Sequence, residues 1–180
     1  MMSPKFHQLI MLLTLTIGAC TNSEIIPEEP KVIPEVSINS LVFGYYFGEC
    51  YGDCAIIYKI ENGKLYIDNI DYPFVPIVDE NGYFSHDVEN ISFEKEPLPH
   101  EHFEIARELL ESFPKELSIL EEQQFGIPDA YDQGGIFLAT ETLQGKKVWK
   151  IDPEDNFQKP EYVVLYRNEI VDVINKIISK

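Results

Sequence analysis

Positive charge is scarce in this chain of 180 residues. Its 14 lysines and arginines face 31 aspartates and glutamates, and the formal net charge at pH 7 is -17. Proteins that bind DNA or RNA carry basic surfaces that neutralise phosphates, so this composition argues against a nucleic-acid partner. We interpret the acidity as a means of keeping the protein soluble. The alternative is attraction of cationic partners or divalent ions.

Long apolar runs are also missing. The run at the N-terminus extends from Leu9 to Ile17, which is about half of the ~20 residues that a membrane-spanning helix needs. Lys5 precedes it and the small residues Gly18 and Ala19 follow it, which is the pattern of a signal peptide. We therefore expect residues 1–19 to be removed from the mature protein.

The four residues Ile17-Gly18-Ala19-Cys20 resemble the lipobox of bacterial lipoprotein precursors. This resemblance implies that Cys20 becomes the first residue of the mature chain and carries a lipid that anchors it to a membrane. An ordinary secretory signal followed by a chance cysteine is the alternative. Thr21 stands where inner-membrane lipoproteins of enterobacteria typically have aspartate. We therefore expect the outer membrane of the cell envelope, at its periplasmic face or on the cell surface.

Residues 20–40 form an acidic segment that contains prolines. Proline removes backbone donors and favours extended chain, so this segment is predicted to be a tether that holds the rest of the protein away from the bilayer. Residues 41–180 have the length of one common domain and are long enough to bury a core of their own. We expect a single globular domain there.

Cysteines are few as well. With Cys20 lipidated, two of the three remain, Cys50 and Cys54 in the stretch GECYGDC. We predict that they form a disulfide, because the envelope is oxidising and the glycines of the loop let the chain turn back on itself. Closing so short a loop stabilises the fold by only ~2 kcal/mol. The disulfide therefore shapes the loop more than it holds the fold.

The same loop is the candidate binding site. Tyr51 lies between the two carboxylates of Glu49 and Asp53, and a preorganised loop loses less entropy on binding. We predict that the loop contacts a protein or glycan partner; the alternative is that Tyr51 packs onto the sheet. Carboxylates beside the sulfurs disfavour a redox-active thiolate, and a zinc site would need histidines at a recognised spacing.

The first half of the domain is predicted to contain three strands, at 41–47, 55–60 and 64–70. Asn62-Gly63 supplies the positive φ angles of a two-residue type I′ turn between the last two strands. The turn sets the register, which pairs Glu61 with Lys64. Lys59 and Asp68 then lie on one face of the hairpin, and the apolar residues on the other, core face are Ile56, Tyr58, Ile60, Leu65 and Ile67.

The rest of the domain is predicted to contain two helices and a second hairpin. Irregular structure is expected over 71–100, where prolines recur, and a helix over 100–113, where apolar residues recur at helical spacing before Pro114. Strands at 134–142 and 146–152 flank a Gln144-Gly145 turn. A second helix is expected from Pro160 onwards, with a strand over YVVLY as the alternative.

These elements predict an α+β fold, with a mostly antiparallel sheet of about five strands and two amphipathic helices packed on one face. From Phe43 to the C-terminus the chain resembles uncharacterised small lipoproteins of Bacteroidetes-type bacteria. The resemblance rests on GECYGDC, on Asp132-Gln133-Gly134-Gly135 before a strand and on the terminal helix. It implies a fold and no chemistry.

Metal ligands are hard to find by pattern. Asp129 and Asp132 lie in a glycine-containing loop and are candidate calcium ligands, although aspartate and glycine are also ordinary loop residues. The stretch from Asp152 to Asn156 resembles half of a calcium loop but lacks its glycine and distal glutamate. His100 and His102 begin a predicted helix, where polar residues are expected on the solvent side. We predict no cofactor.

Catalytic signatures are missing from the sequence too. Ser-His-Asp and Cys-His settings, a phosphate loop and a deaminase motif are all absent, and we assign no catalytic residue. The sequence therefore predicts a lipid-anchored domain that binds or scaffolds. The alternative is an envelope hydrolase, or another enzyme, whose carboxylates meet only in the fold.

The lipobox generates a direct prediction. Cells that express the protein should incorporate labelled palmitate into it, because acylation requires the Cys20 thiol, and Cys20→Ser should abolish the label. Gel fluorography of immunoprecipitated protein measures this, with expression levels matched by immunoblot. A variant that stays labelled would contradict the anchor.

Overall fold

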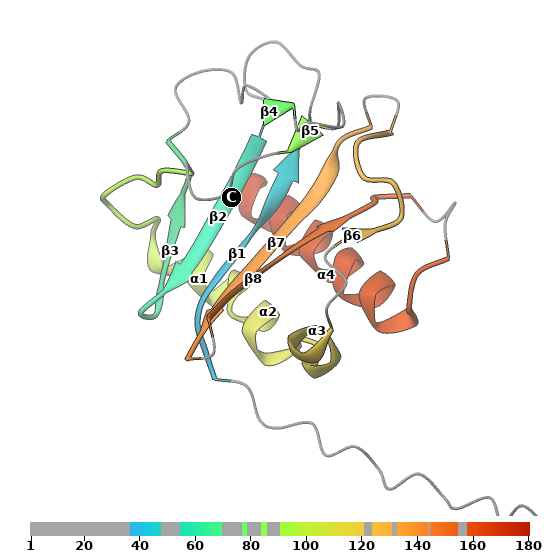
Figure 1. Cartoon of the computed structure of the whole chain (residues 1–180). Coiled ribbons are helices and arrows are strands. Elements are labelled where there is room, and N and C mark those ends of the chain that lie inside the picture. The colour runs from blue at the N-terminus through green and yellow to red at the C-terminus, as the bar shows by residue number, and fades with distance from the viewer. Residues whose placement is uncertain are drawn as a thin grey trace, which may run out of the picture. The chain divides into compact units, whose positions relative to one another are not determined.

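A computed structural model of the chain describes the residues 37–47, 55–69, 77–78, 84–85, 91–120, 124–130, 133–143, 145–154 and 158–180. Its centre is a sheet of six strands in the order β3-β2-β1-β7-β8-β6 (Figure 1). All neighbouring strands are antiparallel except β6 and β8. The predicted α+β class with a mostly antiparallel sheet is confirmed. The strand bounds are β1 Ile38–Tyr46, β2 Ala55–Glu61, β3 Lys64–Ile67, β6 Gln124–Phe125, β7 Gly135–Thr142 and β8 Gly145–Ile151.

The first hairpin has the predicted register. Glu61 pairs with Lys64, and Tyr58 pairs with Ile67. The turn between β2 and β3 has φ angles of 51° at Asn62 and 70° at Gly63, both positive as a type I′ turn requires. Strand β3 ends at Ile67, earlier than predicted, and Asp68 forms an isolated bridge with Phe93.

The second hairpin is shifted by one residue from the prediction. Thr142 pairs with Gly145, so Gly145 is the first residue of β8 and does not belong to the turn. The predicted Gln144-Gly145 turn is therefore wrong in position. A single glycine marks a turn only to within a residue, whereas the register is set by the long pairing that follows it.

The predicted helix over 100–113 is interrupted. It consists of α1 (His100–Ala106) and α2 (Glu108–Glu111), although Arg107 between them keeps helical angles, with φ of -58° and ψ of -30°. The predicted apolar stripe still faces the core, since Ala106, Leu109 and Phe113 are buried. A further helix, α3 (Lys115–Ile119), follows Pro114 and was not predicted, because five residues are too few to show a period.

The C-terminal helix is confirmed. Helix α4 (Glu161–Ile178) starts directly after Pro160, which occupies the N-cap. Every apolar position of its predicted stripe is buried, and the hydroxyl of Tyr166 donates a hydrogen bond of 2.8 Å to the carbonyl oxygen of Leu109. Burial raises the pKa of Tyr166 well above its usual value, so this hydroxyl stays a donor. The stripe consists of Val163, Tyr166, Ile170, Val173, Ile174 and Ile177.

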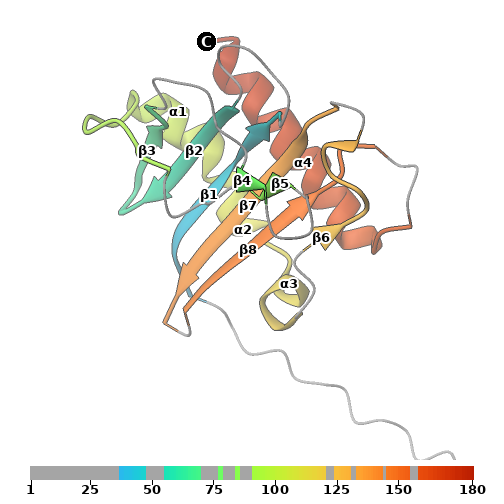
Figure 2. The ribbon, with the colours of Figure 1, turned by 45° about the horizontal axis from the view of Figure 1, so that its top comes forward.

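The labelled helices lie on one face of the sheet, behind it in both ribbon views (Figures 1 and 2). The main core forms between them and the sheet, where the predicted core residues Tyr58, Ile60 and Leu65 are buried. Within the predicted irregular segment, the structure describes the short pair β4 (Ile77–Val78) and β5 (Phe84–Ser85), which are antiparallel, and the residues from 91 onwards. The second turn signal of that segment, Asn81-Gly82, lies outside the described residues.

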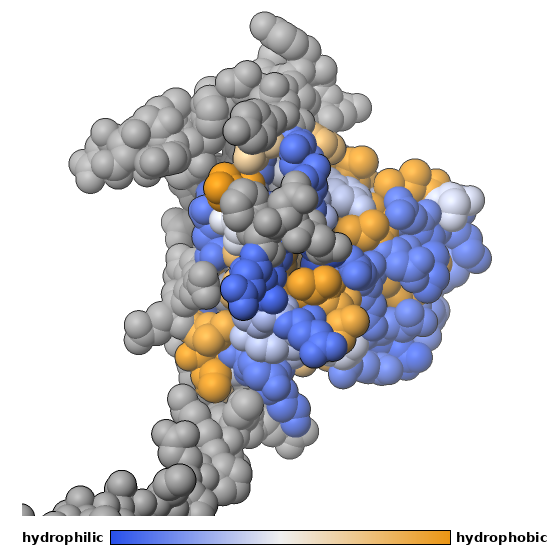
Figure 3. Space-filling view, turned by 90° about the vertical axis from the view of Figure 1, so that its right-hand side faces the viewer, coloured by the Kyte–Doolittle hydropathy of each residue, from blue (hydrophilic) through white to orange (hydrophobic). Residues whose placement is uncertain are grey.

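Exposed apolar side chains are scattered, as expected for a protein surface. Figure 3 shows one side of the domain, where hydrophilic surface separates small apolar spots. Leu165 is 62% exposed on α4, whereas Leu138 of β7 is 0% exposed in the core. These two leucines form a matched pair for testing the packing.

We expect Leu138→Ala to lower the free energy of unfolding by about 2–5 kcal/mol, because it leaves a cavity between the sheet and the helices. Leu165→Ala should change it by less than about 0.5 kcal/mol, since the same methyl groups are already in water. Urea unfolding followed by circular dichroism measures both. Equal effects at the two positions would contradict the assigned faces.

Candidate functional site

The sheet face opposite the helices carries a second apolar cluster. Its five buried residues come from three neighbouring strands, and partly buried side chains, including Ile91 and Phe93, pack against it. The cluster consists of Val42, Tyr46, Ile57, Phe137 and Ala139. This face is therefore built as an apolar floor, although no labelled helix covers it in Figure 2.

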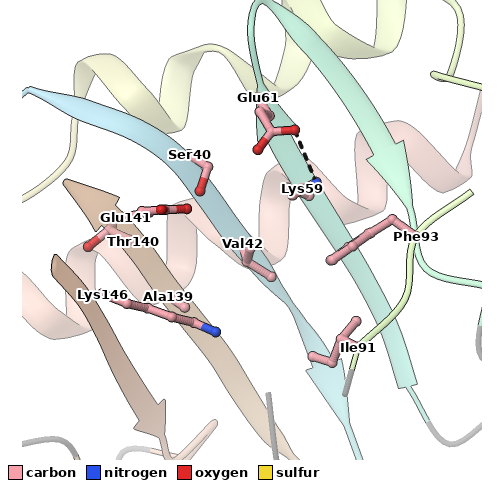
Figure 4. A pocket seen from close by; sticks show the side chains of 10 residues that line it. All are labelled: Ser40, Val42, Lys59, Glu61, Ile91, Phe93, Ala139, Thr140, Glu141 and Lys146. Atoms are coloured by element: carbon pink, nitrogen blue, oxygen red, sulfur yellow. Dashed lines mark hydrogen bonds and ion pairs between the residues drawn. The ribbon is translucent and has the colours of Figure 1, made fainter. Parts of the chain in front are cut away.

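A hollow of about 220 Å³ opens on this face beside the cluster (Figure 4). Val42 and Ala139 contribute to its floor, and Ile91 and Phe93 approach it from a segment that crosses the face. Charged and polar residues from four strands, β1, β2, β7 and β8, complete the lining. These are Ser40, Lys59, Glu61, Thr140, Glu141 and Lys146.

Lys59 is held firmly at one side of the hollow. Its ammonium lies 3.2 Å from a carboxylate oxygen of Glu61, and 5.4 Å and 5.0 Å from the ring centroids of Tyr66 and Phe93. A cation this close to two aromatic rings is attracted by their negative faces. The charge of Lys59 is therefore already balanced within the protein.

Lys146 and Glu141 stand across the hollow from this pair. They are Cα partners on β7 and β8, and both are exposed. Figure 4 shows the side chain of Lys146 extending over Ala139 with its ammonium directed into the hollow. Within the described part of the chain, neither Lys146 nor Glu141 makes a hydrogen bond or an ion pair. Both charges are thus available to a ligand.

An irregularity in β1 shapes this end of the hollow. Ile38 pairs with Thr142 and Ser40 pairs with Glu141, so Asn39 is an extra residue of the bulge type. Ile38 consequently packs against the core on the helix side, whereas Ser40, two residues later, lines the hollow on the opposite face. Without the bulge, both side chains would point to the same face.

A second polar group surrounds Asp152, which is 2% exposed. One carboxylate oxygen accepts a hydrogen bond of 3.0 Å from the backbone N–H of Ile127, and the other accepts one of 2.8 Å from the N–H of Glu154. Both oxygens are therefore used to fix backbone. Asp152, the first residue of the predicted half calcium loop, therefore connects two loops through these hydrogen bonds.

The calcium candidate Asp129 also fixes a loop. Its φ is 63°, its Oδ1 accepts a hydrogen bond of 3.1 Å from the N–H of Gly134, and its own N–H donates to the Gly134 carbonyl at 2.7 Å. Asp132 lies outside the described residues. Among those that the structure describes, no three potential metal ligands of the His, Cys, Asp or Glu type gather at one place.

The phenol of Tyr46 interacts electrostatically with both Asp129 and Asp152. Burial raises the pKa of its phenol well above the usual value, and the carboxylates of Asp129 and Asp152 raise it further. Tyr46 therefore stays protonated and packs as a neutral side chain. The fold thus brings the fields of two carboxylates to one tyrosine at the end of β1.

Most of the predicted site residues cannot be compared with the structure. The cysteine loop and the anchor lie outside the described residues, as do all the side chains assigned to them: Cys20, Glu49, Cys50, Tyr51, Asp53 and Cys54. His100 lies 3.4 Å from Glu104, its neighbour one turn along α1, and stacks on Phe103. This surface arrangement is the one expected for the start of an amphipathic helix.

The hollow itself was not predicted. The one sequence signal for the hollow was the hairpin register, which had placed Lys59 on the face away from the core. Glu141 and Lys146 are far from it in sequence, and only the pairing of β1 with both β2 and β7 brings them to the same face.

Comparison with protein-family models, with curated proteins and with solved structures finds no match to this chain. Within the ranges that the structure describes, none of the helices is long and apolar enough to cross a bilayer.

The Asp152 contacts generate a prediction. Asp152→Asn replaces one acceptor oxygen by an NH₂ group, so one of the two backbone N–H groups faces a donor. We expect the free energy of unfolding to fall by about 1–3 kcal/mol.

Asp172→Asn is the control for this change. Its carboxylate is 62% exposed and pairs with Lys176 one turn along α4, so the effect should stay within about 0.5 kcal/mol. Urea unfolding of both variants measures the difference. Equal losses would show that Asp152 does not hold the two loops.

Proposed function

We propose that this protein is a lipid-anchored protein of the outer membrane of the bacterial cell envelope, whose domain binds a ligand and does not catalyse a reaction. Two observations support the proposal. The Ile17-to-Cys20 sequence resembles a lipobox, and the hollow on the helix-free sheet face combines an apolar floor with charged groups. Binding sites have this composition, because apolar walls supply affinity and a few polar groups set orientation.

The observation that carries the binding function is the pair of charges without partners in the hollow. A surface lysine and glutamate on neighbouring strands usually pair with each other or are solvated. Here Lys146 extends over the apolar floor, and neither it nor Glu141 makes an ion pair in the described part of the chain. Such groups can exchange water for a ligand without breaking an existing contact.

Three carboxylates in the described parts are occupied by contacts within the fold, which favours binding over hydrolysis at these positions. Asp152 uses both oxygens and Asp129 uses one to accept backbone hydrogen bonds, and Glu61 pairs with Lys59. A general acid or base must instead reach the proton that it transfers. These three carboxylates are used to hold the fold.

The cysteine loop stays a predicted contact for a protein or glycan. It connects β1 to β2, and its flanking residues Tyr46 and Ala55 are Cα partners. They lie at the opposite end of β1 from Ser40 and the hollow.

We expect a small molecule to bind in the hollow and to shift the amide resonances around it. The measurement is amide NMR of the full-length protein, ¹⁵N-labelled and purified in detergent, against amino acids, monosaccharides, uronic acids and short carboxylic acids. A binding compound should shift the amides of Ser40, Lys59, Phe93 and Lys146. The amides of α4, on the opposite side of the sheet, serve as the internal reference.

Two outcomes would contradict the binding function. One is that no class of compound shifts any amide at millimolar concentration. The other is that shifts occur only outside the hollow.

A further inference from the structure

We infer that the hollow binds a free α-amino acid with an apolar side chain, held as its zwitterion. This inference rests on the proposed binding function and names the ligand class of the same site. It follows from the size of the hollow, from the signs of its charges and from the nature of its floor.

The size of the hollow limits its occupant. Its volume is about 220 Å³, whereas pockets for drug-sized ligands typically measure ~300–1,000 Å³. An oligosaccharide or a folded partner would extend well beyond such a space. A single amino acid is of the right size.

The charged side chains of the hollow favour a ligand that carries both a positive and a negative charge. Lys59 and Glu61 balance each other at 3.2 Å, which leaves Lys146 and Glu141. These two are Cα partners on adjacent strands, and side chains opposite each other on one sheet face start from Cβ atoms ~5 Å apart. An α-carboxylate can accept from the ammonium of Lys146 while the neighbouring α-ammonium donates to Glu141. In the described part of the chain these two groups do not pair with each other, so a ligand that carries both charges can bind each of them.

The field of the whole chain favours a neutral ligand. A net charge of -17 repels anions from the domain surface, which disfavours a simple carboxylic acid despite Lys146. A simple cation would be attracted over long range but would meet Lys146 in the hollow. A zwitterion carries no net charge and satisfies both groups.

The floor selects an apolar side chain. Val42 and Ala139 are 9% and 1% exposed and belong to the second apolar cluster, against which Ile91 and Phe93 pack. Phe93 is held beneath the ammonium of Lys59, 5.0 Å from its ring centroid, so this wall is preorganised. Leucine or phenylalanine can lay its side chain on this surface, whereas a charged side chain would lose hydration there.

Isothermal titration calorimetry of the full-length protein in detergent tests the inference, with L-leucine as the probe. Two analogues remove one charge each: leucinamide lacks the carboxylate, and N-acetyl-leucine lacks the ammonium. We expect L-leucine to bind saturably and each analogue to bind at least tenfold more weakly, because each loses one charge-assisted contact.

Matched variants assign the two contacts. Lys146→Gln should weaken L-leucine about tenfold but should not weaken leucinamide, because leucinamide has no carboxylate for Lys146 to bind and its ammonium no longer meets a like charge. Glu141→Gln should weaken L-leucine but should not weaken N-acetyl-leucine, because N-acetyl-leucine has no ammonium for Glu141 to bind and its carboxylate no longer meets a like charge. Lys115→Gln makes the same change of charge on α3, away from the hollow, and should bind L-leucine as the parent does. Circular dichroism checks that the variants stay folded.

The possible failures are distinguishable. If another compound class shifts the amides of the hollow while L-leucine and L-phenylalanine do not bind, the ligand class is wrong and the binding function stands. If no compound binds in the hollow, the ligand class and the binding function are both wrong. If L-leucine binds equally well to the parent and to both hollow variants, the assignment to Lys146 and Glu141 is overturned.

Discussion

The antiparallel pairing of β1 with both β2 and β7 is the constraint on which the rest of the structure depends. Strand β1 lies at the centre of the sheet, and its buried side chains serve two faces: Leu41 and Phe43 face the helices, and Val42 belongs to the opposite cluster. Gly44 makes the pairing with β2 possible, because a Cβ there would lie 2.1 Å from the carbonyl oxygen of Ile56. Both the helix-side core and the hollow are consequences of this one strand.

Local sequence predicted the elements that carry their own signals. Asn62-Gly63 determined both the turn type and the register of the first hairpin, and the apolar stripe of α4 extends over enough turns to be unambiguous. The errors fall where local signals are weak. Strand β6 has two residues and pairs in parallel with β8, so it shows no alternation, and α3 is too short for a helical period.

Predicting the hollow would have required knowledge of which strands pair over long distances in the sequence. Alternation along β2 placed Lys59 on the face away from the core, but no local rule brings β7 and β8 beside it. The strand order of the sheet determines this arrangement. In the order β2-β1-β7-β8, strand β7 from the second half of the chain lies next to β1. The bulge at Asn39 adds a further step, because a single extra residue changes which side chain of β1 lines the hollow. Such an insertion leaves no reliable mark in composition or periodicity.

The position of β1 at the start of the described domain has a mechanical consequence. A force that pulls on the chain ahead of Ile38, along the direction of the strand, acts on the central strand of the sheet. Antiparallel hydrogen bonds run across the strands, so such a force loads the ladders to β2 and β7 in shear, with many bonds resisting together. A strand at the edge pulled sideways would instead lose its bonds one after another. The segment that precedes Ile38 is thus connected to the domain through a central strand, which resists being pulled out of the sheet better than an edge strand would.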